Sequence, residues 1–87
     1  MSVYNKCSYK HFLSELDRLL YMKNMVRNDV ANIIGADRAT AMHVLHMMET
    51  GVRVSTSYLE KTADYFGKML CYKDGEYYMV TGEIKGK

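Results

Sequence analysis

The sequence lacks any apolar run close to the roughly 20 residues that a membrane-spanning helix needs. Its first ten residues, MSVYNKCSYK, also lack the apolar core of a secretory signal peptide. Proline is absent, and the only two cysteines are Cys7 and Cys71. Their spacing is not that of a metal site, and in a reducing compartment we expect two free thiols. These absences predict a soluble, cytoplasmic protein that makes no contact with a membrane.

Motifs of catalysis and of cofactor binding are missing as well. The sequence contains no glycine-rich phosphate loop, no pair of acids at a recognisable spacing, and no histidine that would evidently activate either cysteine. His43 and His46 lie three residues apart, but no Cys-x-x-Cys pair or third histidine is near them. We therefore interpret them as solvated or groove-facing side chains. The sequence predicts a protein without enzymatic activity, cofactor or metal.

The composition is that of a small globular domain, with 48% hydrophobic and 25% charged residues. A chain of 87 residues buries only about 60% of the surface that its unfolded state exposes, so a partner subunit would add stability. Eight methionines and eight tyrosines suit adaptable contact surfaces as well as a core. We expect a single domain over residues 1–87, with flexible ends at 1–7 and 81–87.

Two helices are predicted in the first part of the chain, because apolar residues recur there at helical spacing. The first helix begins at Ser8 as its N-cap and runs to about Lys23, and Asn24 is suited to the left-handed conformation that ends a helix. The second helix covers about Val26 to Ile34. Gly35 ends it, since glycine most easily adopts a positive φ.

A third and a fourth helix follow. Asp37 is the expected cap of the third, which runs to about Thr50. Its inward side chains are Ala41, Val44, Leu45 and Met48. Ser57 and Glu60 form a Ser-x-x-Glu capping box, and this pattern starts the fourth helix, which ends at Gly67. The helical core therefore covers residues 8–67, and the fold is mainly α.

The C-terminal part predicts a two-stranded β-hairpin over residues 69–80, because Asp74-Gly75 between β-rich runs is a strong hairpin signal. A two-residue turn pairs Lys73 with Glu76, Tyr72 with Tyr77, Cys71 with Tyr78, and Leu70 with Met79. One face can cover the helices, while the other would be exposed in a monomer and carries Met69, Cys71, Tyr78 and Val80. Pairing with a second copy would protect an open edge and cover that face. We thus expect a homodimer interface made of Leu70, Cys71, Tyr72, Tyr77, Tyr78 and Val80.

The second and third helices fit a helix-turn-helix, in which one helix crosses the DNA backbone and the next lies in the major groove. Such a motif needs a small residue where the helices approach and a glycine-like residue four positions later. Ala31 and Gly35 meet both needs. The outward positions of the third helix are then Arg38, Ala39, Met42, His43 and His46.

Two stretches resemble the lambda-repressor-like (XRE or Cro-type) helix-turn-helix family. KNMVRNDVANIIG, residues 23–35, is similar to the family's first motif helix, and ETGVRVSTSYLEKTADYFG, residues 49–67, is similar to the end of its recognition helix, its basic loop and its fourth helix. Arg27 stands where the family usually has glutamine, and Val26 replaces the usual hydroxyl cap. The resemblance implies a four-helix fold and DNA binding.

The net charge is only +2, so the prediction of DNA binding depends on the arrangement of charges. We expect a sequence-specific regulator of transcription, a repressor of the kind found in phages and mobile elements, that binds double-stranded DNA as a dimer. The expected DNA contacts are Arg27, Arg38, Ala39, Thr40, Met42, His43, His46 and Arg53, with Lys23 and Lys61 as outer contacts.

Two other interpretations are open. The domain could be a protein-binding module or inhibitor that uses its Met- and His-rich third helix against another protein, since fold does not determine function. It could also be a winged-helix protein, with residues 57–69 as the recognition helix and the 69–80 hairpin as the wing. That arrangement predicts DNA contacts from Lys61, Lys68 and Lys73.

Overall fold

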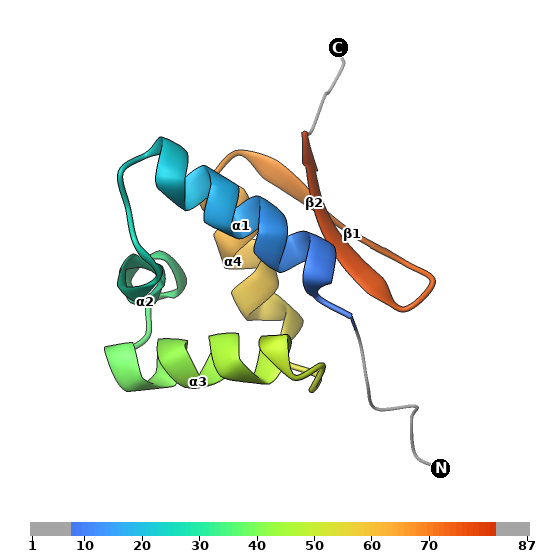
Figure 1. Cartoon of the computed structure of the whole chain (residues 1–87), viewed down its shortest axis with the longest axis horizontal. Helices are drawn as coiled ribbons and strands as arrows, with labels where there is room; N and C mark the ends of the chain where they lie inside the picture. The colour runs from blue at the N-terminus through green and yellow to red at the C-terminus, as the bar shows by residue number, and fades with distance from the viewer. Residues whose placement is uncertain (1–7, 82–87) are drawn as a thin grey trace.

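A computed structural model describes residues 8–81, which form four α-helices, a short 3-10 helix and two β-strands. In chain order they are α1 (Lys10–Met22), η2 (Arg27–Asp29), α2 (Val30–Ile34), α3 (Arg38–Glu49), α4 (Thr56–Tyr65), β1 (Lys68–Lys73) and β2 (Glu76–Thr81). Figure 1 shows the helices on one side and the hairpin on the other. The predicted mainly helical fold with a C-terminal hairpin is confirmed. The expected flexible ends are 1–7 and 81–87. Residues 1–7 and 82–87 lie outside the described residues, and Thr81 is the last residue of β2, so the expectation is wrong at Thr81.

The core is one hydrophobic cluster to which every α-helix and β2 contribute buried side chains. Its largest fully buried members are Tyr9, Phe12, Leu16, Ile34 and Leu59. Every fully buried side-chain nitrogen or oxygen of the described part has a hydrogen-bond partner. No helix between residues 8 and 81 combines the length and the apolar character that crossing a membrane requires.

Helix α1 begins two residues after Ser8, and its cap position is occupied by Tyr9, so the expected cap is wrong by one residue. Ser8 Oγ accepts only a long contact of 3.4 Å from the Lys10 N–H. The backbone of Ser8 instead pairs with the hairpin. At the other end, Asn24 has a φ of 59°, which confirms the left-handed residue after the helix.

The second expected helix is divided, because residues 27–29 form the 3-10 turn η2 before α2 begins. Gly35 ends α2 with a φ of 72°. A Cβ at this position would meet no atom within 4 Å, so the backbone conformation and not crowding requires glycine. Asp37 then caps α3 by accepting a 3.0 Å hydrogen bond from the Thr40 N–H. The four predicted inward residues of α3 are all buried.

Helix α4 begins earlier than the sequence predicts. Its cap is Ser55, whose Oγ accepts from the Ser57 N–H at 3.3 Å, so the proposed capping box of Ser57 and Glu60 is wrong. The reason is tertiary: Val54 is buried, and its N–H donates to the hydroxyl of Tyr9 at 3.1 Å. This contact holds the chain just before the helix, and the next hydroxyl residue becomes the cap.

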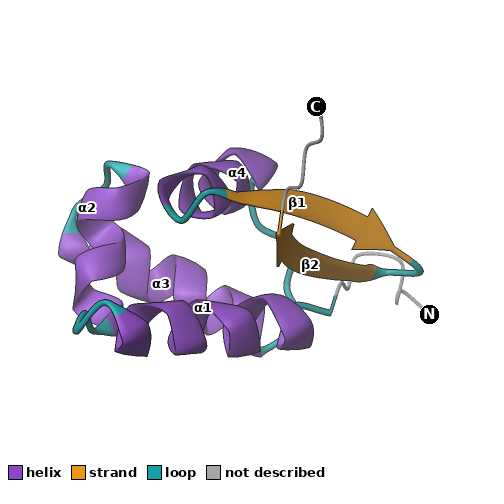
Figure 2. Cartoon of the chain, turned by 90° about the horizontal axis from the view of Figure 1, so that it is seen from above, coloured by secondary structure: helices purple, strands orange, loops and turns teal. Residues whose placement is uncertain are grey.

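The hairpin register is confirmed at every predicted pair, from Lys73–Glu76 to Leu70–Met79. Asp74 and Gly75 have φ values of 54° and 80°, as a two-residue turn with two left-handed residues requires. Helix α1 contacts β2, and α4 contacts β1. In Figure 2, β2 lies between α1 and β1. The sheet therefore has one edge near α1 and one edge turned away from it.

Candidate nucleic-acid interface

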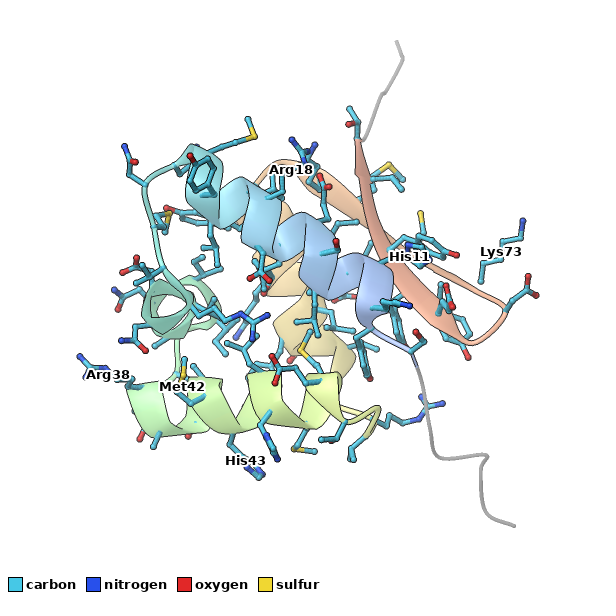
Figure 3. The ribbon with its side chains drawn as sticks, viewed as in Figure 1. His11, Arg18, Arg38, Met42, His43 and Lys73 are labelled. Atoms are coloured by element: carbon cyan, nitrogen blue, oxygen red, sulfur yellow. The ribbon has the colours of Figure 1, made fainter. Side chains whose placement is uncertain are left out.

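The outer side of α3 is the surface that the sequence assigns to DNA. Arg38, Ala39, His43 and His46 are exposed, whereas Thr40 and Met42 are half-buried. In Figure 3, Arg38 projects from the first turn of α3 and His43 points away from the other helices. The helix lies at one side of the molecule with no described element outside it (Figure 1). Its exposed residues are therefore accessible to a partner as large as a duplex.

Charge on this surface is concentrated at its two ends. The stretch from Arg38 to Met48 contains no acidic residue. Arg53 is exposed in the loop that follows α3, so a helix of 12 residues, about 18 Å long, separates it from Arg38. Asp37 precedes Arg38, and hydrogen bonds from the side chain and backbone of Thr40 lower the pKa of its carboxyl. One anion thus lies beside one of the two arginines.

Ala31 and Gly35 are the two residues on which the predicted helix-turn-helix depends. Ala31 is buried, with 8% of its surface exposed, within the core cluster that joins α2, α3 and α4. Helix α2 contacts both α3 and α4. A small side chain at Ala31 and a left-handed Gly35 thus place α3 directly after α2 at a sharp angle, visible in Figure 1.

The guanidinium of Arg27 is bound by two carboxylates of the protein itself. Its Nε and Nη2 donate to the two carboxylate oxygens of Asp17, each at 3.0 Å, and its Nη1 donates to Glu49 Oε2. These bonds raise the pKa of Arg27 above its usual value. Because two carboxylates hold this guanidinium, we assign it to joining α1, η2 and α3 and withdraw the expected phosphate contact. No spacing rule in the sequence links Arg27 to Asp17 or Glu49, which lie in other elements.

The expected dimer residues have different surroundings. Tyr77 is 6% exposed and stacks on Tyr9 with ring centroids 5.3 Å apart, so its side chain belongs to the core and its place at an interface is wrong. Leu70 is half-buried against the core. Tyr72 and Val80 are exposed, and Cys71 and Tyr78 are half-buried. Tyr78 stacks on His11 of α1, and its hydroxyl donates to Glu76 at 3.0 Å, which raises the pKa of Tyr78.

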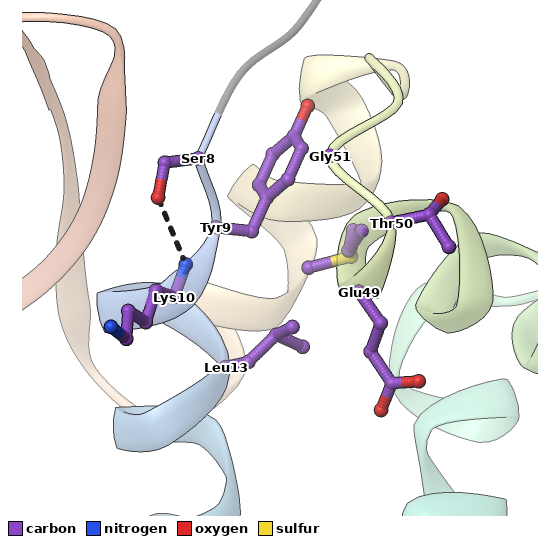
Figure 4. A pocket seen from close by; sticks show the side chains of 8 residues that line it. Ser8, Tyr9, Lys10, Leu13, Glu49, Thr50 and Gly51 are labelled. Carbon is purple, nitrogen blue, oxygen red and sulfur yellow. Dashed lines mark hydrogen bonds between the residues drawn. The ribbon is translucent and has the colours of Figure 1, made fainter.

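An open cleft of about 510 Å³ lies between the start of α1 and the end of α3 (Figure 4). It is lined by Ser8, Tyr9, Lys10, Leu13, Met48, Glu49, Thr50 and Gly51. Its only acid, Glu49, is held by Arg27. Within residues 8–81, no three His, Cys, Asp or Glu side chains are grouped closely enough to hold a metal ion.

No family model, no curated protein and no solved structure matches this chain.

Proposed function

We propose that the protein binds double-stranded DNA and that α3 enters the major groove as its recognition helix. The observation that supports this most is the exposed, acid-free outer side of α3, which follows directly on the left-handed Gly35 at the edge of the molecule. An α-helix with its side chains is about 10–12 Å wide, and the major groove is about 12 Å wide. The resemblance of residues 23–35 and 49–67 to lambda-repressor-like domains agrees with this proposal.

Arg38 is the proposed base-reading residue. It lies in the first turn of α3, the part of a recognition helix that reaches deepest toward base edges in helix-turn-helix complexes. A bidentate arginine–guanine pair contributes about 1–3 kcal/mol of discrimination. Ala39, Thr40 and Met42 are suited to apolar contact with a thymine methyl group. His43 and His46 can donate to base or phosphate acceptors.

Arg53 is the proposed phosphate contact at the far end of α3. Phosphate contacts supply affinity and fix the register, but they carry no sequence information. Since one domain offers few free cations near α3, we expect weak binding by a monomer and stronger binding by a dimer. Repression of transcription is the proposed result, because occupancy of a site blocks other proteins from the same DNA.

The experiment is a salt titration of binding to a random-sequence duplex, measured by fluorescence anisotropy. The variant Arg53→Gln should weaken binding and make the slope of log K against log salt shallower by about one, because Arg53 is the proposed phosphate contact. Arg18→Gln is the matched control, because it removes the same charge on α1, on the side of the molecule opposite α3 (Figure 3). Equal effects of the two variants, or no binding at low salt, would refute the proposal. Selection from a random pool would then report the site and its symmetry.

The winged-helix alternative receives less support from the charges. The exposed side of α4 carries Glu60 and Asp64 beside Lys61. The hairpin tip carries Lys73 with Asp74 and Glu76, so a wing made from it would have more acids than bases. A minor groove attracts cations and repels such a tip.

A protein-binding role is the second candidate. It is favoured by exposed apolar side chains, which are Tyr21 and Met22 at the end of α1, Val26 before η2 and Tyr65 at the end of α4, with exposures of 83, 63, 61 and 52%. Large exposed apolar groups of this kind are typical of protein contacts. The salt titration separates the candidates, because an apolar interface depends only weakly on salt.

A further inference from the structure

The two edges of the hairpin are not equivalent. Ser8 lies parallel beside Glu76 at the outer edge of β2. The Ser8 N–H donates to the Gly75 carbonyl at 2.8 Å, and the Tyr77 N–H donates to the Ser8 carbonyl at 3.0 Å. The residue before α1 thus covers the β2 edge next to the turn. At the outer edge of β1, no backbone hydrogen bond reaches the strand from any other element of residues 8–81.

The pairing of β1 with β2 determines which backbone N–H and carbonyl groups of β1 have no partner strand. In an antiparallel pair, residues alternate between bonding to the partner strand and pointing away from it. Tyr77 points its N–H away from β1, toward Ser8, and its cross-strand neighbour is Tyr72. Tyr72 therefore also points its N–H and carbonyl away from the hairpin, and Leu70 and Lys68 do the same. The free N–H and carbonyl groups of these three alternate residues form a template with which another strand can pair.

This edge lacks two of the features that usually prevent strand pairing, namely proline and a bulge. Natural edge strands are protected by charges, by proline or by a bulge. β1 pairs without a bulge from Lys68 to Lys73 and contains no proline. The ammonium of Lys68 already lies 3.3 Å from Thr81 Oγ1 and 3.8 Å from Glu15, and its side chain is only 16% exposed. On β1 itself, Met69 and Tyr72 are exposed by 51 and 53%, and Lys73 is exposed beside the turn. The groove between α4 and the start of β1 is lined by Glu60, Ala63, Asp64, Lys68, Met69 and Leu70.

We propose that a second copy of this chain covers the edge: two β1 strands pair antiparallel across a two-fold axis beside Cys71 and form a continuous four-stranded sheet. Outward residues must pair with outward residues, so the axis can pass beside Leu70, Cys71 or Tyr72. The axis at Leu70 brings the end of α4 opposite the partner's hairpin tip. The axis at Tyr72 shortens the overlap.

The axis at Cys71 is favoured by apolar pairing. It places Lys68 opposite the partner's Asp74, Met69 opposite the partner's Lys73, and Leu70 opposite the partner's Tyr72. The two symmetry-related pairs of Leu70 with the partner's Tyr72 then lie on either side of the axis, and no like charges face each other.

This inference goes beyond DNA binding and does not depend on it, because the edge and α3 belong to different parts of the molecule (Figure 1). The first experiment is sedimentation equilibrium of the full chain without DNA, comparing the wild type with Tyr72→Pro and Tyr72→Ala. Proline at Tyr72 removes only an outward N–H, so the monomer's own ladder stays intact. Tyr72→Ala removes the ring and keeps the N–H.

The wild type should be a dimer. Tyr72→Pro should raise the dimer dissociation constant by about tenfold or more beyond the effect of Tyr72→Ala, because each dimer loses two backbone hydrogen bonds. Circular dichroism must show that both variants retain the wild-type fold. A wild-type monomer at every concentration, or a dimer that Tyr72→Pro leaves as stable as Tyr72→Ala does, would overturn the proposal. These outcomes do not bear on DNA binding, which the salt titration measures.

The second experiment tests the register by oxidation with copper phenanthroline in a Cys7→Ser background. Cys71 would face its symmetry copy in a non-hydrogen-bonded pair, with a Cα–Cα distance of about 4.5 Å, which lies within the range of disulfides. A covalent dimer is expected to form. The control carries Cys7→Ser, Cys71→Ser and Tyr72→Cys, and its new thiol lies opposite the partner's Leu70. Absence of the Cys71 cross-link, or an equal yield from the control, would contradict the register.

Discussion

Arg27 on η2 donates two hydrogen bonds of 3.0 Å to Asp17 on α1, so a guanidinium that the sequence assigns to DNA connects two helices of the protein itself. The same side chain reaches Glu49 at the end of α3. The orientation of α3 relative to α1 depends in part on this pair of contacts.

Arg27→Gln should lower the free energy of unfolding by about 0.5–1 kcal/mol, since the ion pairs are partly exposed and solvent screens them. The Arg27 side chain is 34% exposed, and those of Asp17 and Glu49 are 51 and 48% exposed. Urea denaturation measures the change. At temperatures where the variant is folded, its affinity for DNA should stay within about twofold of wild type. A loss of affinity as large as that of Arg53→Gln would mean that Arg27 contacts DNA after all.

Tyr9→Phe should cost about 1–3 kcal/mol, because the buried N–H of Val54 would lose the hydroxyl that accepts its 3.1 Å hydrogen bond. For a domain of this size, each kcal/mol lowers the melting temperature by about 4–8 °C. Tyr65→Phe is the control, since its hydroxyl makes only a 3.9 Å contact with Met25 Sδ at the surface. Similar melting temperatures for the two variants would show that the Tyr9 hydroxyl is not needed.

Gly35→Ala should destabilise the domain by about 1–2 kcal/mol, the cost of a left-handed conformation for a residue with a Cβ. The open space around the position excludes a clash as the cause. Gly35→Asn should cost less, because asparagine tolerates this conformation better. Thermal denaturation of both variants is the measurement. If asparagine is as costly as alanine, the explanation from φ is incorrect.

The N-cap of α3 should make stability depend on pH in the acid range. Asp37 has a pKa below its usual 3.8 in the folded protein, chiefly because the Thr40 side chain and then its backbone N–H donate to the carboxylate. A folded pKa below the unfolded one gives stability that is fully present above the unfolded pKa and is lost as the pH falls through the folded pKa. Asp37→Asn keeps an acceptor but does not titrate there.

The difference in stability between wild type and Asp37→Asn should therefore favour the wild type less as the pH falls below about 4. Glu15, whose pKa is lowered chiefly by its hydrogen bond with Arg18, acts in the same direction in both proteins and cancels in the difference. Urea denaturation at several pH values measures it. A difference that does not change with pH would exclude Asp37 as the source.

The parts of the fold that depend on neighbours in sequence were predictable. Asp74-Gly75 determines the hairpin register, because a two-residue turn leaves only one way to pair the strands. The buried side of α3 follows from helical periodicity, and Gly35 and Asn24 follow from their backbone preferences. Each of these features needs only a few residues of chain, so local chemistry is sufficient to determine it.

The start of α4 was not predictable in this way, because Ser55, Thr56 and Ser57 can each cap a helix. The contact of Val54 with Tyr9, 45 positions earlier, selects among them. Ser8 does not cap α1 because its backbone forms hydrogen bonds with Gly75 and Tyr77 of the hairpin.

The sequence by itself determined the helical stripes, the turn residues and the hairpin register of this protein, since each results from interactions over a few bonds. Only the tertiary structure decided that Arg27 binds Asp17 and Glu49, that Tyr77 enters the core, and that β1 is the open edge. Those outcomes depend on which distant surfaces meet when the core closes. The sequence does not show whether a cation or an aromatic ring contacts another part of the protein or faces the solvent, because that depends on which elements lie beside it in the fold.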